Sequence, residues 1–519
     1  MKLLYKVLLN FIVMSATESE SKKPPAEKVA EVFNHMQDVG CCEMCAHLYS
    51  GKSQDSFYER LHKEHIKNGT DVKKPKNNPC ISCLGLLHSP FRENITDKII
   101  SEILASENDY DSFNLAMTLP ISYQMRAHAL AYYVKKNYPE VAHTHNNIFP
   151  WVNIKDVYKA TMAPTIAKTV KRMLKFNSEL TINVKLTYSN DELECFKLLE
   201  LCPDVFGQRN TKKFRGFLFS KKSVDEALNN KKNVKLRNFY INPPSIPNHE
   251  LLCSEVDIKQ NQIYCAGRYN KYSRSLPQSP WIKNNQRRFN SSVQELIAKD
   301  VQNLFKADDY FFSSSGREDV DVRMLGTGRP FSIELINPKC TKVTQKQIDA
   351  LMDKINKENG EKIRVQDMTT VSKDHLKLLK DGEDSKTKTY EALCVSKNPL
   401  TIEHLLNISK CTPLVVNQKT PIRVLHRRAN LVRLKTIHSM DATIIPHSRN
   451  DNQTFFCLKL VTQAGTYVKE FVNGDFGRTL PNLGTLLNDP DIDILALDVL
   501  NIDLDWPPKK KTYTFVTRN

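Results

Sequence analysis

The segment at residues 313–323 gathers the side chains best suited to chemistry, and its sequence is Ser-Ser-Ser-Gly-Arg-Glu-Asp-Val-Asp-Val-Arg. From Arg317 to Arg323 it holds three carboxylates and two guanidinium groups within seven residues. Gly316 permits a backbone turn that residues with side chains resist. One carboxylate could therefore be held beside a fixed cation, which would keep it charged.

A strand is expected to position these groups. The alternation of acidic residues and valines at residues 319–323 predicts that Val320 and Val322 face a core, while the charged residues share the other face. A turn at residues 326–330 and an apolar run at 331–335 predict that this strand belongs to a hairpin. An aspartate at the end of a strand is placed more accurately than one on a free loop.

Two other interpretations of this charge cluster stay open. The first is a hairpin edge whose ion pairs lie in solvent and contribute little to stability. The second is a divalent-metal site. The interleaved arginines disfavour a metal because they compete for the same carboxylates and add positive charge.

The length and the charge of the chain limit its class. A chain of 519 residues predicts two to four domains. Lys plus Arg number 75 against 58 for Asp plus Glu, which gives a net charge of +17 and a pI near 9.1. This favours a polyanionic partner, nucleic acid first, although solvated lysines are the alternative. Thirteen cysteines spread thinly predict reduced thiols.

Two C-x-x-C pairs predict a metal site. Cys42 with Cys45, and Cys80 with Cys83, can each place two thiolates on one tetrahedral ion, so we expect one four-cysteine zinc site. The interval between the pairs is longer than in compact zinc ribbons, and buried free thiols are the alternative. The nearby residues that could replace a ligand are Cys41, His47, His62, His65 and His88.

Composition and pattern divide the chain into six expected segments. They are a flexible leader at 1–30, a metal-binding module at 31–91, an α+β accessory domain at 92–240, a proline-rich linker at 241–250, a larger domain at 251–508 and a tail at 509–519. The first 13 residues resemble a short signal peptide without a cleavage site, so an alternative start or a weak organelle address is expected. No later run approaches the roughly 18 apolar residues of a membrane-spanning helix, and a soluble protein is expected.

Three basic clusters are candidate contacts with a nucleic-acid backbone. The accessory domain contributes Lys212, Lys213 and Lys222, with Phe214, Phe217 and Phe219 interleaved or nearby. Because Phe217 and Phe219 alternate, a buried strand face with the lysines outside is favoured for these two aromatic residues. A loop expected at residues 266–274 contributes Arg268 and Lys271, and a later stretch that also contains Arg423 contributes Arg427 and Arg428. Two capping boxes, Ser292 with Glu295 and Thr344 with Gln347, predict the starts of two helices in the larger domain.

The string Gly316-Arg317-Glu318-Asp319 resembles the Gly-Arg-x-Asp signature of pseudouridine synthases. The strings at residues 266–274, 313–323, 386–393, 419–428 and 465–479 are similar to the tenth pseudouridine synthase family, the archaeal and eukaryotic type that acts on tRNA. The resemblance covers most of residues 250–506. It implies an α+β catalytic domain on a mixed, mainly antiparallel sheet, preceded by a zinc module and a THUMP-containing accessory domain.

The resemblance also implies roles for particular residues. Asp319 would be the nucleophile or electrostatic partner that helps to break the C1′–N1 bond of a flipped uridine. Tyr390 would stack on the base, Lys469 beside Tyr467 would be the basic partner of the aspartate, and Arg317 would lie near the flipped nucleotide. Asp321 would be structural. The substrate would be uridine 54 or 55 in the TΨC arm of tRNA, with structural zinc and no organic cofactor.

The same resemblance gives a monomer in the nucleus and the cytoplasm, with the mitochondrion as an alternative. Two rival functions come from other classes. A non-catalytic RNA-processing scaffold would use the same zinc module and basic domain. A THUMP-associated methyl- or sulfur-transferase is disfavoured because Gly326-x-Gly328 lacks the strand-to-helix context of a nucleotide-binding loop.

Overall fold

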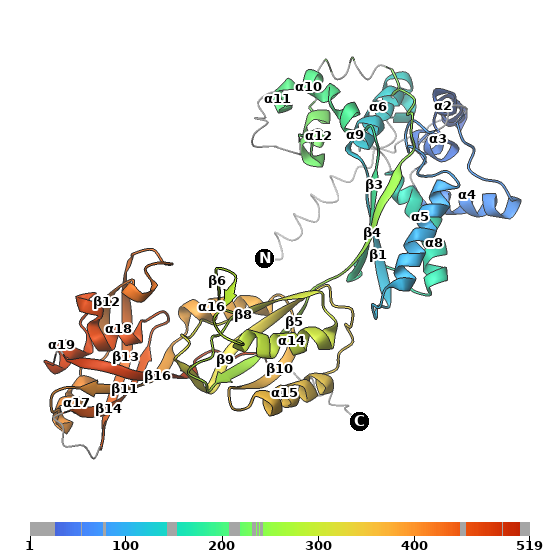
Figure 1. Cartoon of the computed structure of the whole chain (residues 1–519). Helices are drawn as coiled ribbons and strands as arrows, with labels where there is room; N and C mark the ends of the chain where they lie inside the picture. Colours follow the sequence, from blue (N-terminus) through green and yellow to red (C-terminus); the bar gives the residue numbers. More distant parts are fainter. Residues whose placement is uncertain are drawn as a thin grey trace, which may run out of the picture. The chain divides into compact units, whose positions relative to one another are not determined.

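The structure is a computed structural model that describes residues 26–52, 54–75, 79–142, 153–206, 218–230, 235, 238, 242–446, 453–489 and 491–508. The chain forms two compact units, Met1–Lys259 and Gln260–Asn519. Each unit is shown in Figure 1 by its sequence colour, blue to green for the first and yellow to red for the second. Among the helices of the described residues, none is long and apolar enough to cross a membrane.

The first unit packs helices against a four-stranded sheet. The strand order is β2 (Met173–Leu174), β1 (Ser112–Thr118), β3 (Leu180–Thr187) and β4 (Leu252–Gln260), and β1 is parallel to both β2 and β3. The helices are α2 (Ala26–Val39), α3 (Glu43–Tyr49), α4 (Asp55–Asn68), α5 (Phe91–Ala105), α6 (Ile121–Asn137), α7 (Pro139–Ala142), α8 (Ile154–Val170), α9 (Asp191–Cys195), α10 (Lys197–Leu201), α11 (Pro203–Phe206) and α12 (Lys221–Leu228).

One hydrophobic core runs through most of this unit. It joins residues of the cysteine-containing segment, such as Val32 and Tyr58, to residues of the sheet, such as Phe113 and Ile182. The segments at 31–91 and 92–240 therefore share a core. The proline-rich stretch is also held by this unit, because Ser245 O accepts from Arg126 Nη1 at 2.9 Å. The residue that follows the stretch is held too, since Leu84 O accepts from Leu251 N at 3.0 Å.

The second unit is built on a ten-stranded sheet. The strand order is β10 (Ile363–Val371), β5 (Ile263–Lys271), β9 (Arg323–Ile336), β16 (Ile492–Ile502), β11 (Lys388–Ser396), β14 (Thr454–Thr462), β13 (Val432–Ile445), β12 (Leu414–Lys419) and β15 (Thr479–Leu480), and β8 (Asp309–Ser314) pairs with β9. β9 and β16 are parallel and the other pairs are antiparallel. The predicted mixed, mainly antiparallel sheet is confirmed.

Helices accompany the sheet of the second unit (Figure 1), and they are α14 (Val293–Phe305), α15 (Gln345–Asn359), α16 (His375–Ser385), α17 (Ile402–Ser409), α18 (Val468–Asn473) and α19 (Leu483–Leu487). Both predicted capping residues are confirmed. The side chain of Ser292 accepts from Glu295 N at the start of α14, and the side chain of Thr344 accepts from Gln347 N at the start of α15. A small hairpin of β6 (Ile282–Lys283) and β7 (Gln286–Arg287) precedes α14.

The predicted strand at residues 319–323 and the predicted turn at 326–330 are wrong, whereas the apolar run at 331–335 does lie in a strand, β9, which pairs antiparallel with β8. Residues 315–322 form a loop, and the strand begins only at Arg323. The glycines at 326 and 328 lie inside β9 rather than at a hairpin turn. A Cβ at Gly326 would lie 1.9 Å from Leu500 O, and one at Gly328 would lie 2.9 Å from Tyr269 O. Glycine is required at both positions because a neighbouring backbone approaches closely. In the sequence alone, a glycine of this kind looks the same as a glycine in a turn.

Candidate active site and metal site

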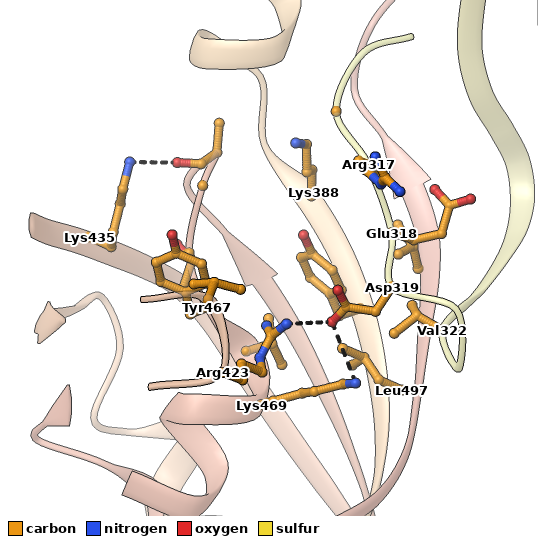
Figure 2. Close-up of a pocket in the computed structure, with 18 of the residues that line it drawn as sticks. Arg317, Glu318, Asp319, Val322, Lys388, Arg423, Lys435, Tyr467, Lys469 and Leu497 are labelled. Atoms are coloured by element: carbon orange, nitrogen blue, oxygen red, sulfur yellow. Dashed lines mark hydrogen bonds and ion pairs between the residues drawn. The ribbon is translucent and has the colours of Figure 1, made fainter. Parts of the chain in front are cut away.

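A pocket in the second unit opens beside the loop at residues 315–322 (Figure 2). Its walls come from six parts of the chain: this loop, β9, β11, residues 423–435, residues 464–469 at the start of α18, and β16. The antiparallel pairing of β11 with β16 places Tyr390 opposite Val499 on one face of the sheet. The basic side chains that line the pocket are Arg317, Arg329, Lys388, Arg423, Arg427, Arg428, Arg433, Lys435 and Lys469.

Two cations lie beside the carboxylate of Asp319. Arg423 Nη1 donates to Asp319 Oδ2 at 2.8 Å, and Lys469 Nζ lies 3.5 Å from the same oxygen. Figure 2 shows both side chains pointing at Asp319. About a third of the Asp319 side chain is exposed, 34%. The aspartate is therefore accessible from the pocket while its negative charge is stabilised from two directions.

Lys469 is shared between two carboxylates. Its Nζ lies 2.7 Å and 2.9 Å from the oxygens of Asp321, which is closer than its contact with Asp319. Burial alone would raise the pKa of Asp321. The hydrogen bond and the charge of Lys469, a backbone hydrogen bond and the charge of Arg423 together outweigh burial and hold that pKa below its usual value. The closest basic partner of Asp319 is therefore Arg423, which the sequence indicated only as a member of a basic cluster.

Arg423 is held in place by a buried acid. Its Nε donates to Glu470 Oε1 at 2.6 Å, and the Glu470 side chain is only 5% exposed. Burial alone would lower the pKa of Arg423, but the bond and charge of Glu470, together with Asp319, raise it above its ordinary value. The guanidinium thus stays charged while it bridges Asp319 and Glu470.

Comparisons with known proteins show the family of this chain. A family profile described as "Pus10, C-terminal" matches residues 264–503, and one described as "Eukaryotic Pus10, N-terminal" matches residues 80–259. The Homo sapiens protein named "tRNA pseudouridine synthase Pus10" is 37% identical over 86% of this chain and 82% of its own length. This chain belongs to the Pus10 family. It is a pseudouridine synthase, and hence an isomerase.

Two further relatives show how widely the Pus10 likeness extends. A Drosophila melanogaster protein named "Putative tRNA pseudouridine synthase Pus10" is 32% identical over 92% of this chain and 98% of its own length. A Thermofilum pendens relative, "tRNA pseudouridine synthase Pus10", is 39% identical over 49% of this chain and 55% of its own. Among solved structures, a Cbf5-Nop10-Gar1 complex matches 45% of this chain and 47% of that chain at 13% identity and a TM-score of 0.23.

Two residues that we predicted to contact RNA are buried in this Pus10 chain, and that prediction is wrong for both. Residues 266–271 belong to the interior strand β5 rather than to a loop. The Arg268 guanidinium donates to the carbonyl oxygens of Thr327 and Leu504, each at 2.7 Å. Lys271 is fully buried. Basic composition alone could not separate such structural cations from RNA contacts, because both occur among polar neighbours in the sequence.

Lys271 instead holds the loop at residues 315–322. Its Nζ donates to the main-chain oxygens of Asp319 at 3.0 Å, Val320 at 2.9 Å and Leu276 at 2.9 Å. Burial lowers the pKa of Lys271 to about 8. An ammonium has three donors, and here each meets a carbonyl, so the backbone that carries Asp319 is fixed from inside the domain.

A buried ion pair supports the other side of the loop. Arg329 Nε donates to Glu318 Oε2 at 2.6 Å, and both side chains are almost inaccessible. Tyr269 Oη donates to the same carboxylate, and Gln278 Nε2 donates to Gly316 O at 3.1 Å. Glu318, the acid that precedes Asp319, therefore has a structural role. The sequence alone did not distinguish Glu318 from the acids that follow it.

The remaining predicted substrate contacts meet at this pocket. Arg317, Tyr390 and Tyr467 all line it. Burial raises the pKa of Tyr390, so its phenol stays neutral. Tyr467 is the residue before α18, and its Oη accepts from Arg428 Nη1 at 2.9 Å. Arg427 and Arg428 line the pocket and are exposed. In the first unit, Lys222 on α12 is also exposed. Lys212 and Lys213 lie outside the described residues.

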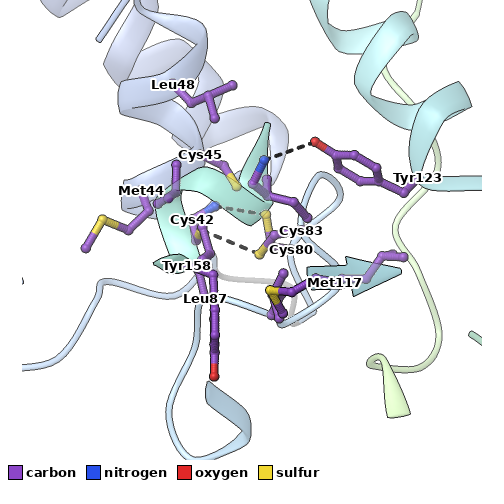
Figure 3. Close-up of a cluster of buried hydrophobic side chains, with 14 of the residues drawn as sticks. Cys42, Met44, Cys45, Leu48, Cys80, Cys83, Leu87, Met117, Tyr123 and Tyr158 are labelled. Atoms are coloured by element: carbon purple, nitrogen blue, oxygen red, sulfur yellow. Dashed lines mark hydrogen bonds between the residues drawn. The ribbon is translucent and has the colours of Figure 1, made fainter. Parts of the chain in front are cut away.

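The first unit contains the candidate metal site (Figure 3). The sulfur atoms of Cys42, Cys45, Cys80 and Cys83 all lie within 4.8 Å of one another, and all four residues are buried. Four thiolates at about 2.3 Å from one zinc ion would lie about 3.8 Å apart, and Cys42 Sγ lies 3.9 Å from Cys83 Sγ. The amides of Cys42 and Ser82 both point at Cys80 Sγ, at 3.3 and 3.4 Å, as donors that suit a thiolate. This cluster could hold one metal ion.

Replacing Arg423 by Met should lower the rate of pseudouridine formation about 10²-fold, because Asp319 loses its closest cation and shifts toward Lys469. The free energy of unfolding should also fall by about 1–3 kcal/mol, since Glu470 is left buried without its partner. Single-turnover rates and urea unfolding would measure the two effects. As a control, Lys435→Met removes another cation of the same pocket that does not contact Asp319. Equal losses in the two variants would contradict this role of Arg423.

Proposed function

We propose that this pocket isomerises uridine 54, uridine 55 or both in the TΨC arm of tRNA. The observation that carries the proposal is Asp319, which is accessible in a basic pocket beside Tyr390 and is paired with Arg423. A uridine can reach such a recessed carboxylate only after it leaves the base stack of its RNA. The basic wall suits the phosphates on either side of that nucleotide.

In the proposed reaction, Asp319 assists cleavage of the C1′–N1 bond as nucleophile or as electrostatic partner. The freed uracil rotates and bonds to C1′ through C5, while C5 loses a proton and N1 gains one. Tyr390 stacks on the base and Arg317 lies against the nucleotide. No electron is transferred and no bond energy is supplied from outside, so the residues need only bind, orient and stabilise charge.

The release of tritium tests the proposed reaction. Transcripts of tRNA carrying uridine labelled at C5 should lose tritium to water when the full chain is added. Transcripts in which uridine 54 or uridine 55 is replaced by cytidine would assign the position. If the chain binds these transcripts but releases no tritium from any of them, it acts as an RNA-binding scaffold and the proposed reaction fails.

The first unit is proposed to be the accessory RNA-binding part, THUMP-like in its role, with structural zinc in the cysteine cluster. Lys222 at the start of α12 is exposed and available to phosphates, and Lys212 and Lys213 are proposed to act with it. The sharing of one core between the cysteine segment and the sheet supports a structural rather than catalytic metal.

Replacing both Arg427 and Arg428 by Ala should weaken tRNA binding and reduce the slope of log Kd against log salt by about 1–2, because each exposed guanidinium releases roughly one counterion from a phosphate. Filter binding between low and physiological salt would measure the slope. Lys377→Ala is the control, since this exposed lysine of α16 does not line the pocket. An unchanged slope in the double variant would exclude both arginines from the phosphate contacts.

A further inference from the structure

Three lysines from two helices gather in the first unit. Lys155 lies in the first turn of α8, where its amide donates to the Asn153 side chain at 3.1 Å, and Lys159 lies one turn later on the same side of the helix. Lys221 opens α12, directly after the N-cap residue Ser220. Lys155 and Lys159 are partly buried and Lys221 is exposed. These three residues are called the lysine cluster.

The helix α6 brings the starts of α8 and α12 together. Tyr123 Oη of α6 accepts from Ile154 N at the start of α8, at 3.3 Å. The next residue of α6, Gln124, donates from Nε2 to Asp225 Oδ1 of α12 at 2.9 Å. Buried apolar side chains of α6 and α12 also pack in one small core. The packing of three helices therefore fixes the backbone positions of the lysine cluster.

The positive charge of the lysine cluster is poorly balanced. Burial, and then the charges of Lys221 and Lys159, lower the pKa of Lys155. The charge of Asp156 opposes them but is outweighed. Within the part of the chain that the structure describes, none of the three ammonium groups forms an ion pair.

This arrangement is unfavourable for the protein on its own. Like charges four residues apart on a helix repel each other, and a cation in the first turn lies at the positive end of the helix dipole. Lys155 meets both conditions and Lys221 meets the second. The stretches that lead into the two helices, residues 143–152 and 207–217, contain no Asp or Glu. A phosphate group would offset the charge, because its oxygens accept charge-assisted hydrogen bonds from ammonium groups.

We infer that the lysine cluster binds a phosphate of the RNA backbone and so holds the first unit on the RNA substrate. The inference rests on the proposed function, in which the first unit is the accessory RNA-binding part. Lys222, the residue after Lys221, is also exposed and continues the basic surface. This favours a backbone phosphate over a free anion, because a long polyanion needs an accessible site that continues into further cations.

Paired charge removals in the full chain would test this assignment. Lys155→Met together with Lys221→Met should weaken tRNA binding about 10-fold at physiological salt. The same change should lower the slope of log Kd against log salt by about 1, as expected for loss of one phosphate contact. The control, Lys135→Met together with Lys136→Met, removes the same charge from exposed positions of α6 and should change the affinity by less than about twofold.

The stability of the RNA-free protein gives an independent test of the lysine cluster. Because the paired change of Lys155 and Lys221 removes repulsion, it should leave the urea midpoint of unfolding unchanged or raise it. A lower midpoint would show that these lysines stabilise the fold, and it would overturn the assignment.

Interference by phosphate ethylation would identify the contacted phosphate. An ethyl group at one phosphate of the tRNA, or at two adjacent ones, should weaken binding to the unaltered chain but not to the chain with Lys155→Met and Lys221→Met. An interference pattern that this variant leaves unchanged, or an equal loss of affinity in the variant and the control, would contradict the assignment.

Inorganic phosphate distinguishes a free anion from the RNA backbone. If phosphate ion raises the unfolding midpoint of the unaltered chain but not of the variant, while both bind tRNA equally, the lysine cluster is a site for a free anion and the assignment fails. Failure of the proposed function is separable from these results, because it would appear as absence of tritium release by the unaltered chain.

Discussion

Replacing Asp319 by Asn should reduce pseudouridine formation by at least about 10³-fold. The amide that replaces the carboxylate is neutral and a poor nucleophile, so it can neither attack the nucleotide nor stabilise positive charge at C1′. Binding of tRNA should change little, because one pocket side chain contributes little beside the phosphate contacts. Tritium release under single-turnover conditions would measure the loss, and the dissociation constant would be measured on the same preparation.

Asp321→Asn is the matched control for this result. Asp321 is two residues away, its side chain is 65% exposed, and it shares Lys469 with Asp319. Replacing Asp321 should lower the rate of pseudouridine formation by less than about 10-fold, since Arg423 still lies beside Asp319. Neither change should lower the free energy of unfolding by more than about 1 kcal/mol, because both acids form partly exposed ion pairs. Comparable rate losses in the two variants would refute the assignment of Asp319 as the essential acid.

Replacing Cys80 by Ser should remove most of the metal and destabilise the first unit. Its sulfur accepts hydrogen bonds from the main-chain amides of Cys42 and Ser82. It also lies close to the sulfurs of the other three cysteines within the same core. Structural zinc sites of this kind contribute about 10–16 kcal/mol of binding free energy to the folded state, so loss of one ligand should cost several kcal/mol. We expect about one zinc per chain in the unaltered protein, far less in the variant, and an earlier calorimetric transition.

Cys41→Ser provides the comparison for this experiment. Cys41 is as buried as Cys80 and is adjacent in sequence to Cys42, but it does not belong to the cluster of four sulfurs. Its replacement should leave the zinc content near one per chain and shift the transition far less. The zinc assignment would not survive a content below about half an equivalent in fresh unaltered protein, or an equal loss of metal in the two variants.

Local sequence patterns were sufficient for several features of this protein. The Gly-Arg-x-Asp string singled out Asp319, which the structure places at the pocket beside Arg423, because a short motif keeps such a residue within a few positions of its turn. The two C-x-x-C pairs located all four sulfurs of the candidate metal site, since each pair brings two thiols together through local backbone geometry alone. The N-cap residues of α14 and α15 were predicted for the same reason.

Tertiary structure alone decided which charged residues do what. Glu318, Asp319 and Asp321 are neighbours in sequence, but the first is buried against Arg329, the second faces the pocket, and the third is largely exposed. Arg423 reaches Asp319 across 104 positions of sequence, a contact that no local pattern encodes. Arg268 and Lys271 have the composition of RNA contacts but are buried structural donors. Burial and long-range pairing depend on which strands become neighbours in the sheet, so these roles appear only once the strands are assembled.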